Sequence, residues 1–223
     1  MSLRLLLLGT GSPRPTLERA NTGQIVFAGE QPILVDCGAG VMRRLLESGL
    51  DPARITLLFL THLHSDHTLD YAEFILGSWA MGRGELAVYG PPGTERLHRL
   101  LLLEPYADDI AYRVSLGCSP AGVLDIAVQE CPLGPGVIYD DDGLRVRSVP
   151  VIHSAPTLAL RFDYAGRSLV ISGDTAYCPA LVELARGADV LVHDACLAPA
   201  LALQPNPLWG DLAERLRHHH ATP

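Results

Sequence analysis

The stretch Thr61-His62-Leu63-His64-Ser65-Asp66-His67 places three histidines and one carboxylate within six residues. It directly follows Ile55–Leu60, an apolar run of the kind that forms a buried strand. Side chains two apart at a strand end project to the same side, so His62 and His64 can bind one metal ion together. The last two residues of the stretch follow where the chain turns toward a helical pattern, and they are placed to bind a second ion. The alternative is a chance cluster of solvated histidines, which this spacing behind a strand disfavours.

Composition predicts one globular domain. The chain has 223 residues, of which 48% are apolar, so it can bury a full core. Its formal net charge is −8, and all 17 basic residues are arginine. Contacts to phosphate supply most of the affinity of proteins for nucleic acids, so this acidic chain is not expected to bind them generally. A local basic patch made by folding stays open.

The cysteines and the N-terminus predict a cytoplasmic protein. The cysteines are odd in number, show no C-x-x-C spacing, and are interpreted as reduced, mostly buried thiols: Cys37, Cys118, Cys131, Cys178 and Cys196. The run Leu5–Leu8 is too short for the core of a signal peptide, so it is expected to be a first strand. No segment approaches the length of a membrane span.

Two strand-rich halves follow one another along the chain. The first is expected to have strands at residues 3–8, 24–28, 33–36, 55–61 and 86–89, with helices at 41–48, 68–76 and 93–103. After an irregular stretch at 104–122, the second is expected to have strands at 123–130, 144–150, 158–163, 168–172 and 189–192, with helices at 179–186 and 208–217. This α+β pattern suits two packed sheets covered on their outer faces.

Three further polar residues follow predicted strands. His153 comes at the end of a strand over 144–152, and Asp174 breaks the strand that ends at residue 171. Taken alone, Asp174 would be a turn-forming aspartate; beside the histidine stretch it becomes a candidate metal ligand. Asp36 follows the apolar residues 33–35. A role at the metal site and a role as a cap or turn carboxylate are equal alternatives for this residue.

Taken in order, these motifs resemble the metallo-β-lactamase superfamily, and within it the ribonuclease Z-like and arylsulfatase-like hydrolases. The matching pieces are Gly9–Pro13, Leu34–Gly40, the histidine stretch, His153-Ser154, Ser172–Thr175 and Val192–Ala195. The resemblance implies a four-layer αβ/βα sandwich with metals at one edge between the sheets. It also implies that residues 1–223 form one domain.

The resemblance implies a di-zinc site, with Mn²⁺ or Fe²⁺ as alternative metals. One zinc would be bound by His62, His64 and His153, the other by Asp66 and His67, with Asp174 bridging the two. A bridging carboxylate holds two ions roughly 3.5–4 Å apart, where a shared water loses a proton near neutral pH. In the family, the aspartate at position 36 orients a metal-binding histidine.

A catalytic pair is implied near the end of the chain. His193-Asp194-Ala195 aligns with the family's His-Glu-Ala-Thr motif, and His220-Ala221-Thr222 aligns with its His-Ser-Thr motif. In the family, the carboxylate of the first motif supports the histidine of the second motif, and this histidine protonates the leaving group. Asp194 is one methylene shorter than glutamate, so its reach to His220 is open. The alternative for residues 218–220 is a solvated polar stretch or part of a tag. His98 is expected on the surface of a helix.

These observations favour a metal-dependent hydrolase of a phosphodiester, sulfate ester or similar small ester, with Asp66 orienting a metal-bound hydroxide. The alternatives are a ribonuclease Z-type endonuclease acting at the 3′ end of tRNA, a lactone or thioester hydrolase, and a non-catalytic metal-binding module. Only 20 residues separate His153 from Asp174, which leaves no room for the long arm that grips tRNA in family members. The loop at 15–21 matches the family's substrate loop only loosely. A homodimer is expected from the family.

The resemblance also predicts that part of the fold is missing. Family members carry a further metal-binding histidine after a last helix and strand, whereas this sequence stops at Pro223, where that helix would begin. No other residue is expected to fit that role. We therefore expect a domain that lacks its C-terminal helix and strand, with a weakly bound second metal and an exposed apolar surface.

Overall fold

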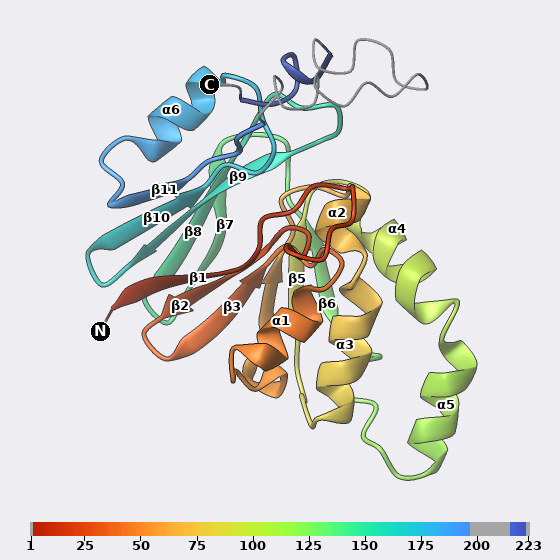
Figure 1. Ribbon diagram of the computed structural model, residues 1–223. Coiled ribbons are helices and arrows are strands. Elements are labelled where there is room, and N and C mark those ends of the chain that lie inside the picture. The colour runs from red at the N-terminus through yellow and green to blue at the C-terminus, as the bar shows by residue number, and fades with distance from the viewer. Residues whose placement is uncertain (1, 197–214, 222–223) are drawn as a thin grey trace. The chain divides into compact units, whose positions relative to one another are not determined.

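The computed structural model describes residues 2–196 and 215–221 (Figure 1). The chain divides into two compact units, Met1–Pro132 and Leu133–Pro223. No helix in the described ranges is long and apolar enough to span a membrane. All five cysteines carry free thiols, and three of them are buried.

The first unit is built on a six-stranded mixed sheet in the order β1-β2-β3-β4-β5-β6. Its strands are β1 (Leu3–Gly9), β2 (Gly23–Ala28), β3 (Gln31–Val35), β4 (Leu57–Phe59), β5 (Ala87–Gly90) and β6 (Ala127–Glu130). The first three strands pair antiparallel, whereas β3 to β6 pair in parallel. Parallel neighbours need long crossovers, and all three crossovers here contain helices.

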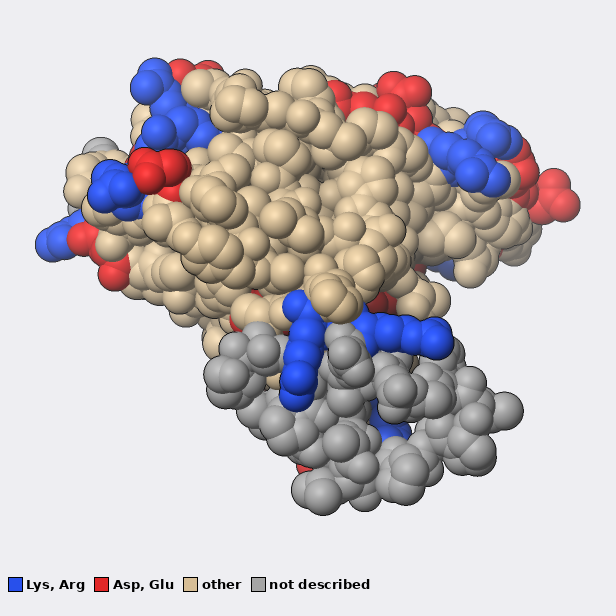
Figure 2. All heavy atoms as spheres, turned by 90° about the horizontal axis from the view of Figure 1, so that it is seen from above, with Lys and Arg blue, Asp and Glu red and all other residues tan. Residues whose placement is uncertain are grey.

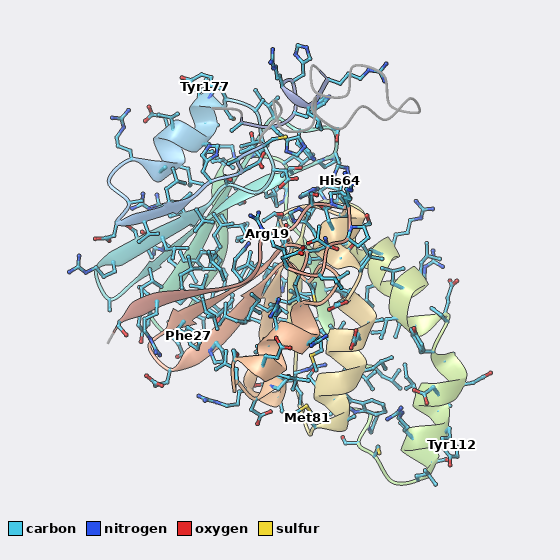
Figure 3. The ribbon with its side chains drawn as sticks, viewed as in Figure 1. Arg19, Phe27, His64, Met81, Tyr112 and Tyr177 are labelled. Atoms are coloured by element: carbon cyan, nitrogen blue, oxygen red, sulfur yellow. The ribbon has the colours of Figure 1, made fainter. Side chains whose placement is uncertain are left out.

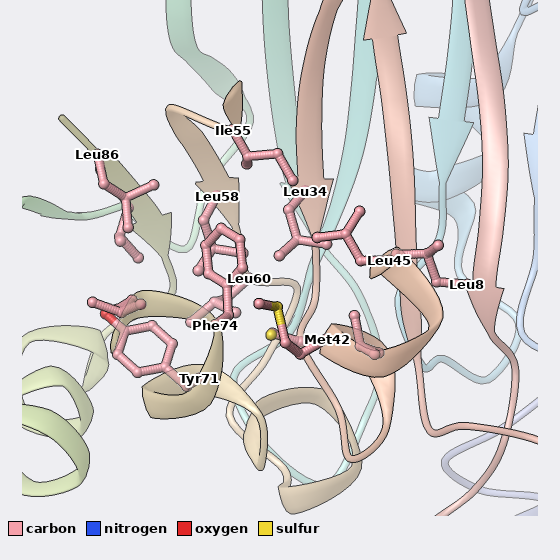
Figure 4. Close-up of a cluster of buried hydrophobic side chains, with 14 of the residues drawn as sticks. Leu8, Leu34, Met42, Leu45, Ile55, Leu58, Leu60, Tyr71, Phe74 and Leu86 are labelled. Carbon is pink, nitrogen blue, oxygen red and sulfur yellow. The ribbon is translucent and has the colours of Figure 1, made fainter. Parts of the chain in front are cut away.

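Those helices form the core with the sheet. They are α1 (Val41–Glu47), α2 (Ser65–Thr68), α3 (Tyr71–Ala80), α4 (Thr94–His98) and α5 (Ala107–Ser115), with a 3-10 turn at Pro52–Arg54 and a π-helical turn at Arg99–Leu103. Figure 4 shows Met42 of α1 and Phe74 of α3 beside Leu34 and Leu58 of the strands, in one buried cluster. Each such side chain stabilises the fold by about 1.5–3 kcal/mol relative to an exposed one. This packing fixes the end of β4, from which the histidine stretch begins.

The second unit has a five-stranded sheet in the order β11-β10-β9-β8-β7. Its elements are β7 (Gly136–Asp141), β8 (Leu144–Pro150), β9 (Leu158–Tyr164), β10 (Arg167–Ile171), α6 (Pro179–Ala185) and β11 (Val190–Val192). The helix α6 connects the parallel strands β10 and β11 and packs against β8 to β10. The turn between β9 and β10 is tight, because Ala165 and Gly166 both have positive φ, at 50° and 74°.

The predicted fold class is confirmed: the protein is α+β, with two mixed sheets and helices. Four details differ from the sequence-based expectation. The irregular stretch contains α5, which is polar on average and buries one side chain, Ile110. The strand β7 was not expected, because it has no alternating pattern and none of its side chains is buried. The strand β6 belongs to the first sheet, not to the second set.

The fourth difference is that the helix expected at 68–76 is split into α2 and α3 at Leu69 and Asp70. Most of the helix expected at 208–217 lies outside the described residues. The single-domain organisation over residues 1–223 stays a prediction.

Candidate metal centre

The histidine stretch connects the end of β4 to α2 in the first unit. His62 is fully buried, Asp66 and His67 are buried, and His64 is half-buried at the start of α2. Figure 3 shows His64 at this end of the sheet. Polar side chains gathered in a buried place need partners that replace water, and metal coordination is one such partner.

The donors in this stretch fit a transition metal. His62 Nε2 lies 3.1 Å from His64 Nδ1. Two nitrogens that bind the same zinc ion at about 2.0–2.1 Å in tetrahedral geometry lie about 3.3–3.4 Å apart. A small increase in the distance between these two nitrogens would therefore admit an ion. Imidazole and carboxylate donors together suit Zn²⁺, Mn²⁺ and Fe²⁺. The local geometry therefore agrees with the predicted role of His62 and His64 as a chelating pair.

The structure places Asp36 against the histidine stretch. Asp36 Oδ2 lies 2.9 Å from His67 Nδ1, and both side chains are 1% exposed. A carboxylate only accepts hydrogen bonds, so His67 carries its proton on Nδ1 and keeps the Nε2 lone pair for a metal. Asp36 also has a left-handed backbone, with φ of 59°, a strained conformation that tends to occur at functional sites. Of the two alternatives for Asp36, the geometry supports the one that orients a histidine.

The loop after β3 is held tightly against α2. Cys37 N–H donates to the His67 carbonyl at 2.7 Å, and Thr22 N–H donates to the Asp66 carbonyl at 3.0 Å. A Cβ atom on Gly38 would lie only 2.0 Å from the Asp66 carbonyl oxygen. Glycine is therefore required at position 38 because two backbones approach each other closely there. This contact fixes the position of Asp66 and His67 relative to β3.

The second unit brings its predicted site residues together. His153 follows β8, Asp174 follows β10, and Asp194 follows β11. His220 Nδ1 lies 2.9 Å from Asp194 Oδ2 and 3.8 Å from Asp174 Oδ2. The shorter side chain of Asp194 therefore does reach His220, and residue 220 is half-buried, not part of a solvated stretch.

Two of these side chains are oriented by backbone groups. His153 Nδ1 donates to the carbonyl of His219 at 2.9 Å, which leaves His153 Nε2 to bind a metal. Thr175 N–H donates to Asp194 Oδ2 at 3.2 Å, and Asp194 N–H donates to Ser172 Oγ at 2.9 Å. Ligand atoms of His153, Asp174 and His220 lie within 4.8 Å of one another. A ring nitrogen of His220 therefore lies among candidate ligands, and the expectation that no other residue fits the missing ligand's role stays a prediction.

Some expectations about other residues are corrected. His98 is buried, not on the surface, and its Nδ1 is hydrogen-bonded to the Tyr71 hydroxyl at 2.8 Å. Burial lowers the pKa of His98. His193 and His218 are exposed. The side chain of Thr61 and the carbonyl of His219 were missed, and only the position of Thr61 directly before the stretch could have drawn attention to it.

The exposed apolar surface expected from the sequence stays a prediction. The strand β11 lies at the edge of its sheet, and Val190 and Leu191 are 45% and 46% exposed.

Comparisons with known proteins identify the family. A sequence model of the beta-lactamase superfamily domain matches residues 31–223. The chain is 40% identical over 197 residues to ribonuclease Z of Mycobacterium marinum, covering 86% of this chain and 70% of the relative. It is 38% identical over 222 residues to ribonuclease Z of Mycobacterium avium, covering 95% of this chain and 77% of the relative.

Solved structures agree on the fold. Human tRNase Z, short form, superposes with a TM-score of 0.71 at 24% identity, covering 98% of this chain and 84% of that one. The metallo-beta-lactamase fold protein YhfI from Bacillus subtilis gives a TM-score of 0.67 at 18% identity, covering 87% of this chain and 72% of that one. The protein is therefore a hydrolase of the metallo-β-lactamase superfamily and belongs to its ribonuclease Z-like branch.

Proposed function

We propose that this protein is a metal-dependent endonuclease that cleaves precursor tRNA at its 3′ end. The observation that carries the proposal is the pair formed by His220 and Asp194, 2.9 Å apart, beside Asp174. A histidine held by a carboxylate is the arrangement that general-acid catalysis needs. The relatives called ribonuclease Z, at 38% and 40% identity, support RNA as the substrate over the small ester favoured by sequence alone.

The proposed metal ligands come from both units. We assign His62, His64 and His153 to one ion, Asp66 and His67 to the other, and Asp174 to both. When bound, a pair of divalent ions activates water and stabilises the negative charge that develops on the phosphate. The buried position of Asp66 suits a group that both binds metal and orients the attacking water.

The proposed cleavage step needs one proton for the leaving group. Water adds to phosphorus and releases one of its protons to solvent, while the bond from phosphorus to the ribose oxygen breaks and that oxygen needs a proton. His220 supplies it from Nε2, because its Nδ1 is engaged with Asp194. Asp194 stabilises the positively charged form of the ring before the transfer.

A small phosphodiester or related ester remains a second candidate, and one observation favours it. The 20 residues between His153 and Asp174 contain the β9–β10 hairpin with its two-residue turn, and no extended arm. On the face shown in Figure 2, basic and acidic side chains are mixed toward the two ends, several basic side chains lie together at the lower middle, and the broad area between is uncharged. The lack of an arm in residues 154–173 is the observation that does not favour strong binding of a large RNA.

One panel assay separates the two candidates. Metal-loaded protein is compared on precursor tRNA with a 3′ trailer, the matching mature tRNA, a bis-aryl phosphate, an aryl sulfate and a lactone. We expect a single cut in the precursor, with kcat/KM well above that for the bis-aryl phosphate. Cleavage of the bis-aryl phosphate alone would overturn the tRNA assignment and favour the small phosphodiester.

The acid role of His220 is tested with a matched variant. His220→Ala should lower the cleavage rate by about 10²–10⁴-fold, whereas His218→Ala, in the same segment but exposed, should not. A leaving group of low pKa needs no proton, so an activated aryl ester should restore much of the rate of His220→Ala. Equal losses on both substrates would contradict the acid role. The cytoplasmic location and the homodimer also remain part of this proposal.

A further inference from the structure

We propose that the hydroxyl of Thr61 is a positioning group that connects Asp36 to His62. Through it, one buried carboxylate fixes the ring orientation of histidines from both proposed metal positions, His62 indirectly and His67 directly. The inference rests on the proposed metal assignment, but not on RNA as the substrate. Every contact that carries it lies within the first unit.

The hydroxyl of Thr61 lies between two polar groups in a place closed to water. Thr61 and His62 are 0% exposed, and Asp36 is 1% exposed. Thr61 Oγ1 lies 2.8 Å from Asp36 Oδ2 and 3.1 Å from His62 Nδ1. Both distances are those of ordinary hydrogen bonds.

The direction of these hydrogen bonds follows from the chemistry of the groups. The Asp36 carboxylate has no proton to give, so the Thr61 hydroxyl must donate to it. A hydroxyl has only one proton, so its oxygen can only accept from His62. His62 therefore carries its proton on Nδ1, and its Nε2 keeps the lone pair.

That lone pair points where a metal is expected. His62 Nε2 lies 3.1 Å from His64 Nδ1, its partner in the chelating pair. With the other tautomer, His62 would present an N–H group to the metal position and could not bind the ion. The Thr61 hydroxyl therefore selects the tautomer that can coordinate, as carboxylates and carbonyls commonly do behind metal-binding histidines.

Asp36 reaches the other metal position without an intermediary. Its Oδ2 also accepts from His67 Nδ1 at 2.9 Å, and its Oδ1 accepts from Thr61 N–H at 2.7 Å. The Thr61 hydroxyl is 3.5 Å from His67 Nδ1, so the carboxylate is the closer partner of that ring. Removal of the Thr61 hydroxyl should therefore disturb the ion at His62 and His64 more than the ion at His67.

Three variants separate hydrogen bonding from packing. Thr61→Val keeps the branched shape and loses the hydroxyl, whereas Thr61→Ser keeps the hydroxyl and loses the methyl group. Asp36→Asn affects both histidines. Metal affinity is measured by chelator competition on the full chain loaded with Zn²⁺ or Co²⁺, and the melting temperature monitors folding.

We expect Thr61→Val to lower the affinity for one of the two ions by about 10–100-fold and to change the affinity for the other by no more than a few-fold. Thr61→Ser should restore the affinity of the weakened ion. Asp36→Asn should lower the affinity for both ions. Adding Thr61→Val to Asp36→Asn should lower these affinities little further, because both changes break one connected hydrogen-bond network. Equal losses of metal affinity in Thr61→Val and Thr61→Ser, or no loss of affinity in either variant, would overturn the proposal.

Nuclear magnetic resonance of the zinc-loaded parent protein gives a test that needs no variant. The ¹⁵N shifts of the His62 ring should show a protonated Nδ1 and a metal-bound Nε2, and that proton should exchange slowly with water. Coordination through Nδ1 of His62 would overturn the proposal. Failure to cleave tRNA, with both metal results as expected, would reject the RNA substrate and leave the role of Thr61 intact.

Discussion

At the scale of single residues, Asp66 is the side chain on which the proposed chemistry depends most. Asp66→Ala removes a proposed metal ligand and the group that orients the attacking water, so hydrolysis should fall by at least about 10²–10⁴-fold. Ser65→Ala is the matched control, because Ser65 is the exposed neighbour of Asp66. Rates are measured on the best substrate of the panel at saturating metal. Comparable activity of Asp66→Ala and the parent protein would remove the proposed mechanism.

The buried His98 should make the stability of the protein depend on pH. Because burial lowers its pKa in the folded state below the ordinary value of 6.5, the unfolded chain binds this proton more readily. This contribution to stability is fully present above about pH 6.5 and is lost as the pH falls toward the folded-state pKa. Urea unfolding at pH 7.5 and at pH 5.5 should therefore show less stability at the lower pH.

The variant His98→Asn isolates this effect. Asparagine can still hydrogen-bond the Tyr71 hydroxyl near the position of Nδ1, but it does not titrate. Between pH 7.5 and pH 5.5, the variant His98→Asn should therefore lose less stability than the parent protein. His218→Asn, which removes an exposed histidine, should behave as the parent does. Identical pH dependence in the parent and His98→Asn would contradict the prediction.

How much of the site the sequence predicts depends on how each residue acts. His62, His64 and His67 were found because ligand chemistry needs their side chains at a fixed spacing behind a strand. The carbonyl of His219 could not be found, because any residue supplies a carbonyl. The burial of His98 was missed because it depends on Tyr71, which is 27 residues away in the sequence.

At the scale of elements, the site depends on the close approach of the loop after β3 to α2. Gly38→Ala would place a methyl group 2.0 Å from the Asp66 carbonyl oxygen and must push the two segments apart. Overpacking of this kind costs about 1–3 kcal/mol of stability. Because Asp66 and His67 move with α2, metal affinity should fall as well. Gly134→Ala is the matched control, since no atom lies within 4 Å of its added methyl group. Unchanged metal affinity in Gly38→Ala would contradict the idea that this contact positions the ligands.

Elements with long apolar runs were predicted better than elements that are polar on average. The strands β8, β9 and β10 alternate or bury long apolar runs, and their expected ranges agree with the structure to within one residue. The helix α5 was missed because it is polar on average, and only Ile110 is buried along it. The strand β6 was assigned to the wrong sheet because a sequence does not show which edge a strand joins after a long crossover.

At the scale of the whole molecule, the order of the motifs predicted the family, but neither unit carries the full proposed ligand set. His62 and His64 belong to the first unit, whereas His153 and Asp174 belong to the second. If one dinuclear centre uses both units, metal binding must connect them energetically. Removal of metal by a chelator should then lower the melting temperature of the whole chain, because binding free energy adds to folding free energy.

The proposed ligand assignment makes a specific prediction about metal content. The parent protein should bind about two ions per chain. His62→Ala and His153→Ala should each reduce the tightly bound metal to about one ion, because both residues are assigned to the same ion. The double variant should lose no more than either single variant, since the ion that it would lose is already gone. Metal analysis after mild purification, repeated after reconstitution with zinc, gives the counts, and His193→Ala, an exposed histidine, is the control. A double variant that loses both ions would show that the two histidines serve different ions, and the assignment of ligands across the two units would then be wrong.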